Sequence, residues 1–148
     1  MPLAKVLHLA NSVDRSHNLR ALRRSHRATD LDTRSRGEFR KKKTINGPKL
    51  DAGIIGVELG ARVTMVQFSS AFCSPCRATK ALLEDMVTKM PDVRYAHIDA
   101  ESHLELVRQL DIRSTPTTLF LNAAGVEVGR AMGTPKRSQV MAAIDAIR

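Results

Sequence analysis

The chain has 148 residues, a length typical of one domain, and 43% of them are hydrophobic, which is enough for a single core. Its formal net charge is +9, and the whole excess lies within residues 1–50, which hold 13 basic and 4 acidic side chains. Two cysteines are too few for the disulfide framework of a small secreted protein, and no stretch approaches the roughly 18 apolar residues of a membrane-spanning helix.

Residues 1–49 form a basic segment that is poor in large apolar side chains, and we expect it to be disordered. Lys5 and His8 interrupt its apolar beginning, so we expect no signal peptide. The run from Arg40 to Lys43 is typical of a patch that binds nucleic acid or another anionic surface, and a solvated tail is the alternative. The turn-forming residues 46–48 predict a domain boundary, with a globular domain over residues 50–148.

Short apolar runs alternate with helical periodicity in the globular domain. Residues 54–57 form either a short edge strand or an irregular lead-in. Strands are predicted at residues 62–68, 93–99, 117–121 and 126–132. Helices are predicted after Pro75, from about Ser102, and over the apolar stripe that ends at Ile147. Strands separated by helices are expected to run parallel, and the last two strands to form an antiparallel hairpin, so the sequence predicts an α/β fold with a small mixed sheet and helices on both faces.

Cys73 and Cys76 lie where the strand at 62–68 gives way to a helix. Unpaired N–H groups and the positive end of the helix dipole face a sulfur at such a place, and cysteines there have lowered pKa values that favour the thiolate. Cys76 lies one helical turn further along the same face, within reach of a disulfide. Pro75 is tolerated in the first turn, which Ser74 can cap. The pattern predicts Cys73 as the nucleophile and Cys76 as the resolving thiol.

A Cys-X-X-Cys pair can also be half of a zinc site, which needs two further ligands. The histidines of the globular domain are His97 and His103, and neither has a paired ligand spacing. A structural disulfide without turnover is the other alternative. We expect a redox pair with no metal and no cofactor, because two sulfurs can carry the whole reaction.

Three features follow one another over residues 61–148: the strand at 63–68, the motif Phe72-Cys73-Ser74-Pro75-Cys76-Arg77, and the segment Ser114-Thr115-Pro116-Thr117. Together they resemble the thioredoxin family, with its Trp-Cys-Gly-Pro-Cys-Lys turn and its cis-proline segment. The chain looks most similar to short thioredoxin-domain proteins of actinobacteria, in which a membrane-anchoring segment often precedes the domain. The resemblance implies a thioredoxin-like fold with a sheet of four to five strands.

The resemblance also implies a protein dithiol–disulfide oxidoreductase, more specifically a reductase, with a cis bond between Thr115 and Pro116. A groove for an extended client strand is expected from six residues: Phe72, Ser74, Pro75, Thr115, Pro116 and Gly133. The implied partners are client proteins with disulfides and an upstream thiol reductant such as a thioredoxin reductase. We expect a cytoplasmic monomer, with membrane association as the alternative.

Two departures from the family concern the resolving cysteine. Gln67 stands where the family has a buried acid, and Tyr95 stands where it has the matching lysine. A carboxylate that could help to deprotonate Cys76 is therefore missing. We expect mixed disulfides to be resolved more slowly than in ordinary thioredoxins.

A binding module is the alternative function. In this interpretation a thioredoxin-like domain of modest activity is delivered to nucleic acid or to an anionic membrane by the basic segment. Such binding should weaken steeply with salt, because counterion release scales with the number of phosphates contacted. It should also vanish in a chain that begins at Lys49.

Overall fold

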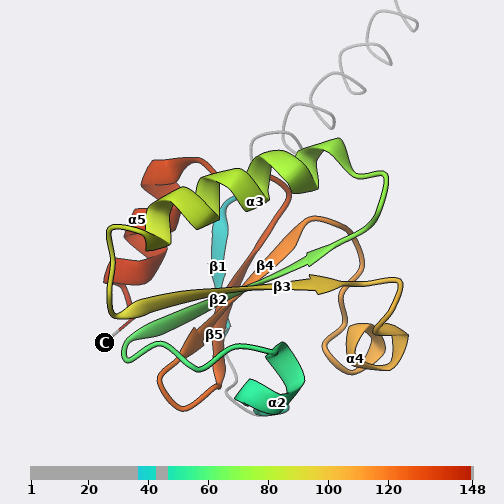
Figure 1. The fold of residues 1–148 in the computed structure, drawn as a ribbon, viewed down its shortest axis with the longest axis horizontal. Coiled ribbons are helices and arrows are strands. Elements are labelled where there is room, and N and C mark those ends of the chain that lie inside the picture. Colours follow the sequence, from blue (N-terminus) through green and yellow to red (C-terminus); the bar gives the residue numbers. More distant parts are fainter. Residues whose placement is uncertain (1–36, 43–46, 148) are drawn as a thin grey trace, which may run out of the picture. The chain divides into compact units, whose positions relative to one another are not determined.

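The computed structural model describes residues 37–42 and 47–147, which form a five-stranded mixed sheet with helices on both faces (Figure 1). The strand order is β1-β5-β4-β2-β3, in which β2 and β3 run parallel and the other neighbours antiparallel. The elements in chain order are β1 Phe39–Lys41, α2 Ala52–Ile55, β2 Val63–Ser69, α3 Ser74–Val87, β3 Val93–Asp99, α4 Leu104–Gln109, β4 Thr117–Asn122, β5 Glu127–Met132 and α5 Arg137–Asp145. The predicted α/β class is confirmed, as is the order of elements from β2 onward.

The sheet separates two apolar cores. Helices α3 and α5 cover one face, where Leu83 and Ile144 pack with Met65, and α2 and α4 lie against the other, where Ile55 packs with Phe68 (Figure 1). Successive side chains of a strand alternate between the faces, so central strand β2 contributes to both cores, and all seven of its residues are buried. Each large apolar side chain buried in this way stabilises the fold by about 1.5–3 kcal/mol relative to an exposed one.

Helix α3 owes its orientation to the spacing of its buried residues. Cys76, Thr79, Leu83 and Met86 are the buried positions, three or four residues apart, and they form one face of the helix. Pro75 occupies the first turn, where its missing N–H costs no hydrogen bond. This face turns Cys76 toward the sheet and leaves Cys73 just outside the helix, at its N-cap.

The direction of β4 differs from the sequence prediction. The strand was expected to run parallel to β2 because a helix precedes it, but it runs antiparallel, with Thr117 opposite Phe68. A crossover must carry the chain back along the full strand, about 23 Å for the seven residues of β3. The six residues of α4 span only about 9 Å. Strand β4 therefore begins at the end of the sheet where β3 ends, and it runs in the opposite direction to β2 and β3.

The lead-in to the domain is helical, so the prediction of a strand or irregular segment at residues 54–57 is wrong. Helix α2 begins after Asp51, whose carboxylate accepts the N–H of Ile54 at 3.0 Å. It ends at Gly56, which adopts a left-handed conformation with φ 75°. These are ordinary helix start and stop signals, but only one turn lies between them.

The predicted boundary between residues 49 and 50 falls too late in the chain. Strand β1 lies inside the segment expected to be disordered, yet it pairs with β5, with Phe39 opposite Ala131. The Phe39 ring meets Phe120 edge to face at a centroid distance of 5.2 Å and fills the space beside Gly129, which has no side chain. The packing of Phe39 thus holds β1 in the sheet although its other two residues are charged. The predicted disorder of residues 1–36 and 43–46 lies outside the described residues.

Candidate active site

The two cysteines lie at the junction of β2 and α3 and form a disulfide, with their Cα atoms 5.1 Å apart. Cys73 is the N-cap of α3, and its Sγ accepts the backbone N–H of Cys76 at 3.1 Å. Cys73 is half-buried, whereas Cys76 is only 3% exposed. An incoming sulfur can therefore reach Cys73, while Cys76 is shielded by the helix and the sheet.

The outer rim of the site is formed by the loop between β2 and α3. Phe72 is 99% exposed and extends into solvent, and Ser74 and Pro75 are also exposed. The carbonyl of Pro75 accepts the hydroxyl of Thr79 at 2.9 Å and that of Thr134 at 3.4 Å. The turn that carries both cysteines is thus tied to its own helix and to the loop after β5.

The segment predicted to carry a cis-proline lies beside this turn. The Thr115–Pro116 peptide bond is cis, as the resemblance implies. The hydroxyls of Thr115 and Ser70 are 3.1 Å apart, and the N–H of Gly133 donates to the carbonyl of Pro116 at 2.8 Å. The structure therefore brings the predicted residues 115, 116 and 133 together next to the loop that leads to Cys73. Ser70, which makes the link, has no signal in the sequence.

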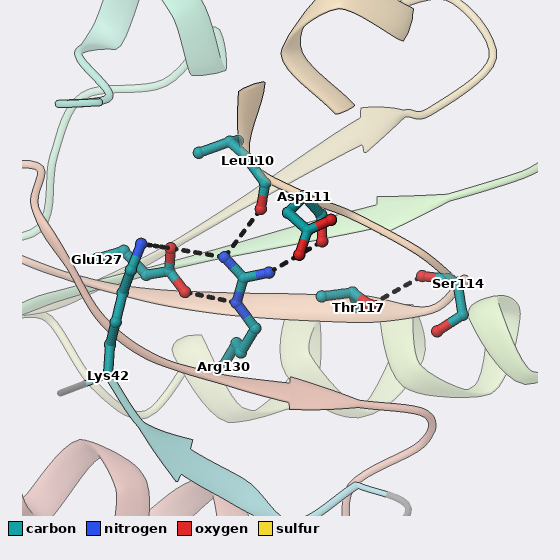
Figure 2. Close-up of polar contacts among 7 residues, drawn as sticks. All are labelled: Lys42, Leu110, Asp111, Ser114, Thr117, Glu127 and Arg130. Atoms are coloured by element: carbon teal, nitrogen blue, oxygen red, sulfur yellow. Dashed lines mark hydrogen bonds and ion pairs between the residues drawn. The ribbon is translucent and has the colours of Figure 1, made fainter. Parts of the chain in front are cut away.

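An ion cluster around the buried Glu127 supports the chain that precedes the cis bond (Figure 2). Arg130 donates to the carbonyls of Leu110 and Asp111 at 3.0 and 3.3 Å, and its guanidinium also pairs with Glu127. Lys42, which follows β1, bonds the same carboxylate at 2.8 Å. Strand β5 is thereby connected both to β1 and to the loop between α4 and β4.

Gln67 lies directly behind the inner cysteine, and its side-chain amide is fully engaged. Its Nε2 donates to the carbonyl of Cys76 and to the hydroxyl of Ser69, each at 2.9 Å. Its Oε1 accepts the hydroxyl of Tyr95 at 2.8 Å. Burial raises the pKa of the Tyr95 phenol well above its ordinary value, with the charge of Glu84 adding to the effect, so the phenol stays a donor. The pair Gln67–Tyr95 holds the backbone of Cys76 and carries no ionisable proton near neutral pH.

A cavity of about 280 Å³ is lined by both cysteines. Its charged and titratable lining side chains are Arg77, Lys80, His97 and Asp99. No local pattern in the sequence places His97 and Asp99 beside the cysteines, because their position depends on how β3 pairs with β2.

Metal binding finds no support in the part of the chain that the structure describes. Within residues 37–42 and 47–147, no three His, Cys, Asp or Glu side chains are grouped so that they could hold a metal ion.

Comparison with known proteins agrees with this geometry. The family model named Thioredoxin matches residues 56–146. This chain belongs to the thioredoxin family. Among solved structures, the thioredoxin of Fasciola hepatica superposes with a TM-score of 0.54 at 25% identity, covering 60% of this chain and 84% of that one. The thioredoxin NaTrxh of Nicotiana alata gives a TM-score of 0.54 at 26% identity, covering 60% and 75%. The predicted thioredoxin-like fold is confirmed.

The curated thioredoxins that match do so over part of their length. Thioredoxin H5 of Oryza sativa subsp. japonica is 35% identical over 60 residues, which cover 40% of this chain and 44% of the rice protein. Thioredoxin H-type 1 of Nicotiana tabacum is 31% identical over 81 residues, covering 55% and 63%. The chain thus spans about half of the length of such relatives. The special likeness to actinobacterial proteins stays a prediction.

The described residues contain no helix long and apolar enough to cross a membrane. Most of the basic segment lies outside the described residues. Its expected anionic partner, whether nucleic acid or membrane, stays a prediction.

Proposed function

We propose that this thioredoxin-family chain is a protein dithiol–disulfide oxidoreductase that works mainly as a reductase. The observation that carries the proposal is the unequal exposure of two bridged sulfurs at a helix N-terminus. Cys73 is half-buried at the N-cap, and Cys76 is buried one turn further along. A thiolate at an N-cap is stabilised by the helix dipole and by backbone N–H groups, here that of Cys76.

The reaction begins with the reduced pair. The Cys73 thiolate attacks one sulfur of a client disulfide, a new S–S bond forms, and the other client sulfur leaves with the bonding electrons and takes up a proton. Cys76 then loses its proton and attacks Cys73, which releases the second client sulfur and forms the Cys73–Cys76 bond. Two electrons have passed to the client, and an upstream thiol reductant must return them.

Client recognition is assigned to the surface around Cys73. We place the client strand along Thr115, Pro116 and Gly133, with Ser74 and Pro75 on the opposite side of the sulfur. Support comes from the hydrogen bonds that join Gly133 to Pro116 and Thr115 to Ser70. The exposed Phe72 ring offers an apolar contact for a client side chain at the rim.

Trapping tests the proposal. The full-length Cys76→Ser variant should accumulate mixed disulfides between Cys73 and client proteins, which appear on non-reducing gels and disappear with dithiothreitol. The matched control is Cys73→Ser, which keeps one thiol and should trap nothing. Alkylation of the reduced protein supplies a second criterion. If Cys73 is alkylated with the pH dependence of free cysteine, near a pKa of about 8.5, and traps no client, the proposed function is wrong.

The remaining assignments concern partners and compartment. We propose client proteins with disulfides and a thioredoxin reductase or similar thiol reductant as partners of a monomeric protein. We propose the cytoplasm as its location, because a reductase needs a compartment that keeps thiols reduced. Cell fractionation followed by redox-state labelling of Cys73 tests the location, and recovery of the protein in a membrane fraction would contradict it.

A further inference from the structure

His97 lies on the same face of the sheet as the inner cysteine. Strands β2 and β3 are parallel and in register, with His97 opposite Gln67. Side chains opposite each other in neighbouring strands project from the same face. Gln67 donates to the carbonyl of Cys76, so this is the face covered by α3. His97 and Cys76 accordingly line one cavity.

The resolving step requires a proton acceptor near Cys76, because a thiolate and not a thiol attacks a disulfide. The hydrogen-bonded pair of sheet side chains behind Cys76, Gln67 and Tyr95, cannot fill this role. Gln67 is an amide without an ionisable proton, and burial raises the pKa of the Tyr95 phenol that is bonded to it, with the charge of Glu84 adding to the effect. The position directly behind Cys76 is therefore electrically neutral.

The other charged groups that face the cavity are poor acceptors. From α3 come Arg77 and Lys80, which are cations. From β3 comes Asp99, whose pKa is lowered by the hydrogen bond from Ser102 and the backbone N–H of residue 101. A carboxylate stabilised in this way binds protons weakly at neutral pH.

His97 has the properties that these groups lack. The His97 side chain is exposed, but partial desolvation against the sheet lowers the pKa of its imidazole, Lys80 on α3 lowers it further, and the charges of Asp99 and Glu84 offset part of the effect. A lowered pKa favours the neutral ring, whose unprotonated nitrogen can accept a proton. Water can connect the two groups, because a cavity of about 280 Å³ has space for several molecules of about 30 Å³ each.

We propose that His97 accepts, through water in this cavity, the proton that leaves the Cys76 thiol during resolution of the mixed disulfide. The inference rests on the proposed function. As Cys76 attacks the Sγ of Cys73, the bond between Cys73 and the client breaks, and the client sulfur leaves with the electron pair. The proton of Cys76 passes to His97 and then to solvent. The client disulfide is the only oxidant.

A two-phase thiol assay separates this step from the first one. Reduced full-length protein is mixed in stopped flow with less than one equivalent of 5,5′-dithiobis(2-nitrobenzoate). Attack by Cys73 releases the first coloured thiolate in a concentration-dependent phase, and resolution by Cys76 releases the second in a concentration-independent phase. The His97→Asn variant should slow the second phase by about tenfold or more, since a positioned base contributes about 10²–10⁴-fold. The first phase should stay within about twofold.

The pH dependence and a rescue experiment exclude a merely structural effect. The rate of the second phase should show an inflection below pH 7 in the unaltered protein, and none in His97→Asn. Added imidazole should restore part of the rate in that variant. The Lys80→Met variant keeps His97 and should move the inflection to higher pH, because it removes a cation beside the ring. The matched control is His103→Asn, because both histidines are exposed but only His97 lines the cavity.

The outcomes distinguish the two proposals. Absence of the first phase in the unaltered protein overturns the proposed function. A normal first phase with an unchanged second phase in His97→Asn overturns only the role of His97. An inflection that does not move in Lys80→Met overturns it as well, even if His97→Asn does not fold.

Discussion

Glu127 is the buried acidic centre of the ion cluster that it forms with Arg130 and Lys42, and neutralising it should destabilise the fold substantially. The side chain is 2% exposed and accepts three charge-assisted hydrogen bonds. Two come from Arg130 at 2.6 and 2.8 Å, and one comes from Lys42 at 2.8 Å. Glu127→Gln keeps the shape of the side chain but removes its charge and turns an N–H donor toward a cation.

We expect Glu127→Gln to lower the free energy of unfolding by about 3 kcal/mol. Removal of one partner from a buried ion pair costs about 3–5 kcal/mol. The low end of this energy range applies because both cations are partly exposed and Arg130 keeps its hydrogen bonds to two carbonyls. Urea unfolding of the full chain, followed by circular dichroism at pH 7, measures the loss. The matched control is Glu105→Gln, whose side chain is 74% exposed and lies 3.7 Å from Arg108; this change should cost less than about 0.5 kcal/mol.

The stability lost in Glu127→Gln should also depend on pH. Burial alone would raise the pKa of Glu127, but the hydrogen bonds and charges of Arg130 and Lys42 outweigh it and lower the pKa below the ordinary value. A lowered folded-state pKa contributes stability above the unfolded pKa of about 4.3, and this contribution is lost as the pH falls through the folded value. The difference between the unaltered protein and Glu127→Gln should shrink below about pH 4. Equal losses for both variants at pH 7 would refute the reasoning.

Three further predictions concern packing, backbone conformation and the resolving step. Leu83→Ala should lower the free energy of unfolding by about 3 kcal/mol in urea titrations, because it leaves a cavity in a fully buried core. Gly125→Ala should cost about 3 kcal/mol and Gly56→Ala about 1 kcal/mol, since both residues have φ 75° but only at Gly125 would a Cβ overlap the carbonyl of Leu50; equal costs would contradict this. Gln67→Asp should accelerate the second phase of the thiol assay severalfold by adding a carboxylate behind the buried cysteine, and an unchanged rate would show that the missing acid does not slow resolution.

The strongly periodic part of the fold was predictable from the sequence. Strand β2 is a dense apolar run, and α3 repeats its apolar residues every three or four positions, so both elements follow from local pattern. The Cys73–Cys76 pair followed in the same way, because its spacing and its place at a helix start are visible in the chain. Each of these sequence patterns lies within a single element or at the junction of two consecutive elements, so no distant contact is needed to interpret it.

Features that depend on distant contacts were missed or only partly foreseen. Strand β1 is three residues long and charged, and only the contact of Phe39 with Phe120 explains its place in the sheet. The direction of β4 depends on the length of α4, whose ends the periodicity does not define closely. His97 reaches the cysteine cavity through the register of β3 against β2, which no local pattern encodes.

The pairing of β1 with β5 matters for any shortened form of the protein. A chain that begins at Lys49 would lack β1 and leave the outer N–H and C=O groups of Glu127–Met132 bare. An exposed edge strand of this kind can pair with strands of other molecules, so such a chain is prone to self-association. In a binding experiment, precipitation of this chain would be mistaken for a loss of binding by the basic segment. A chain that begins at Gly37 lacks most of the basic segment but keeps β1 paired with β5.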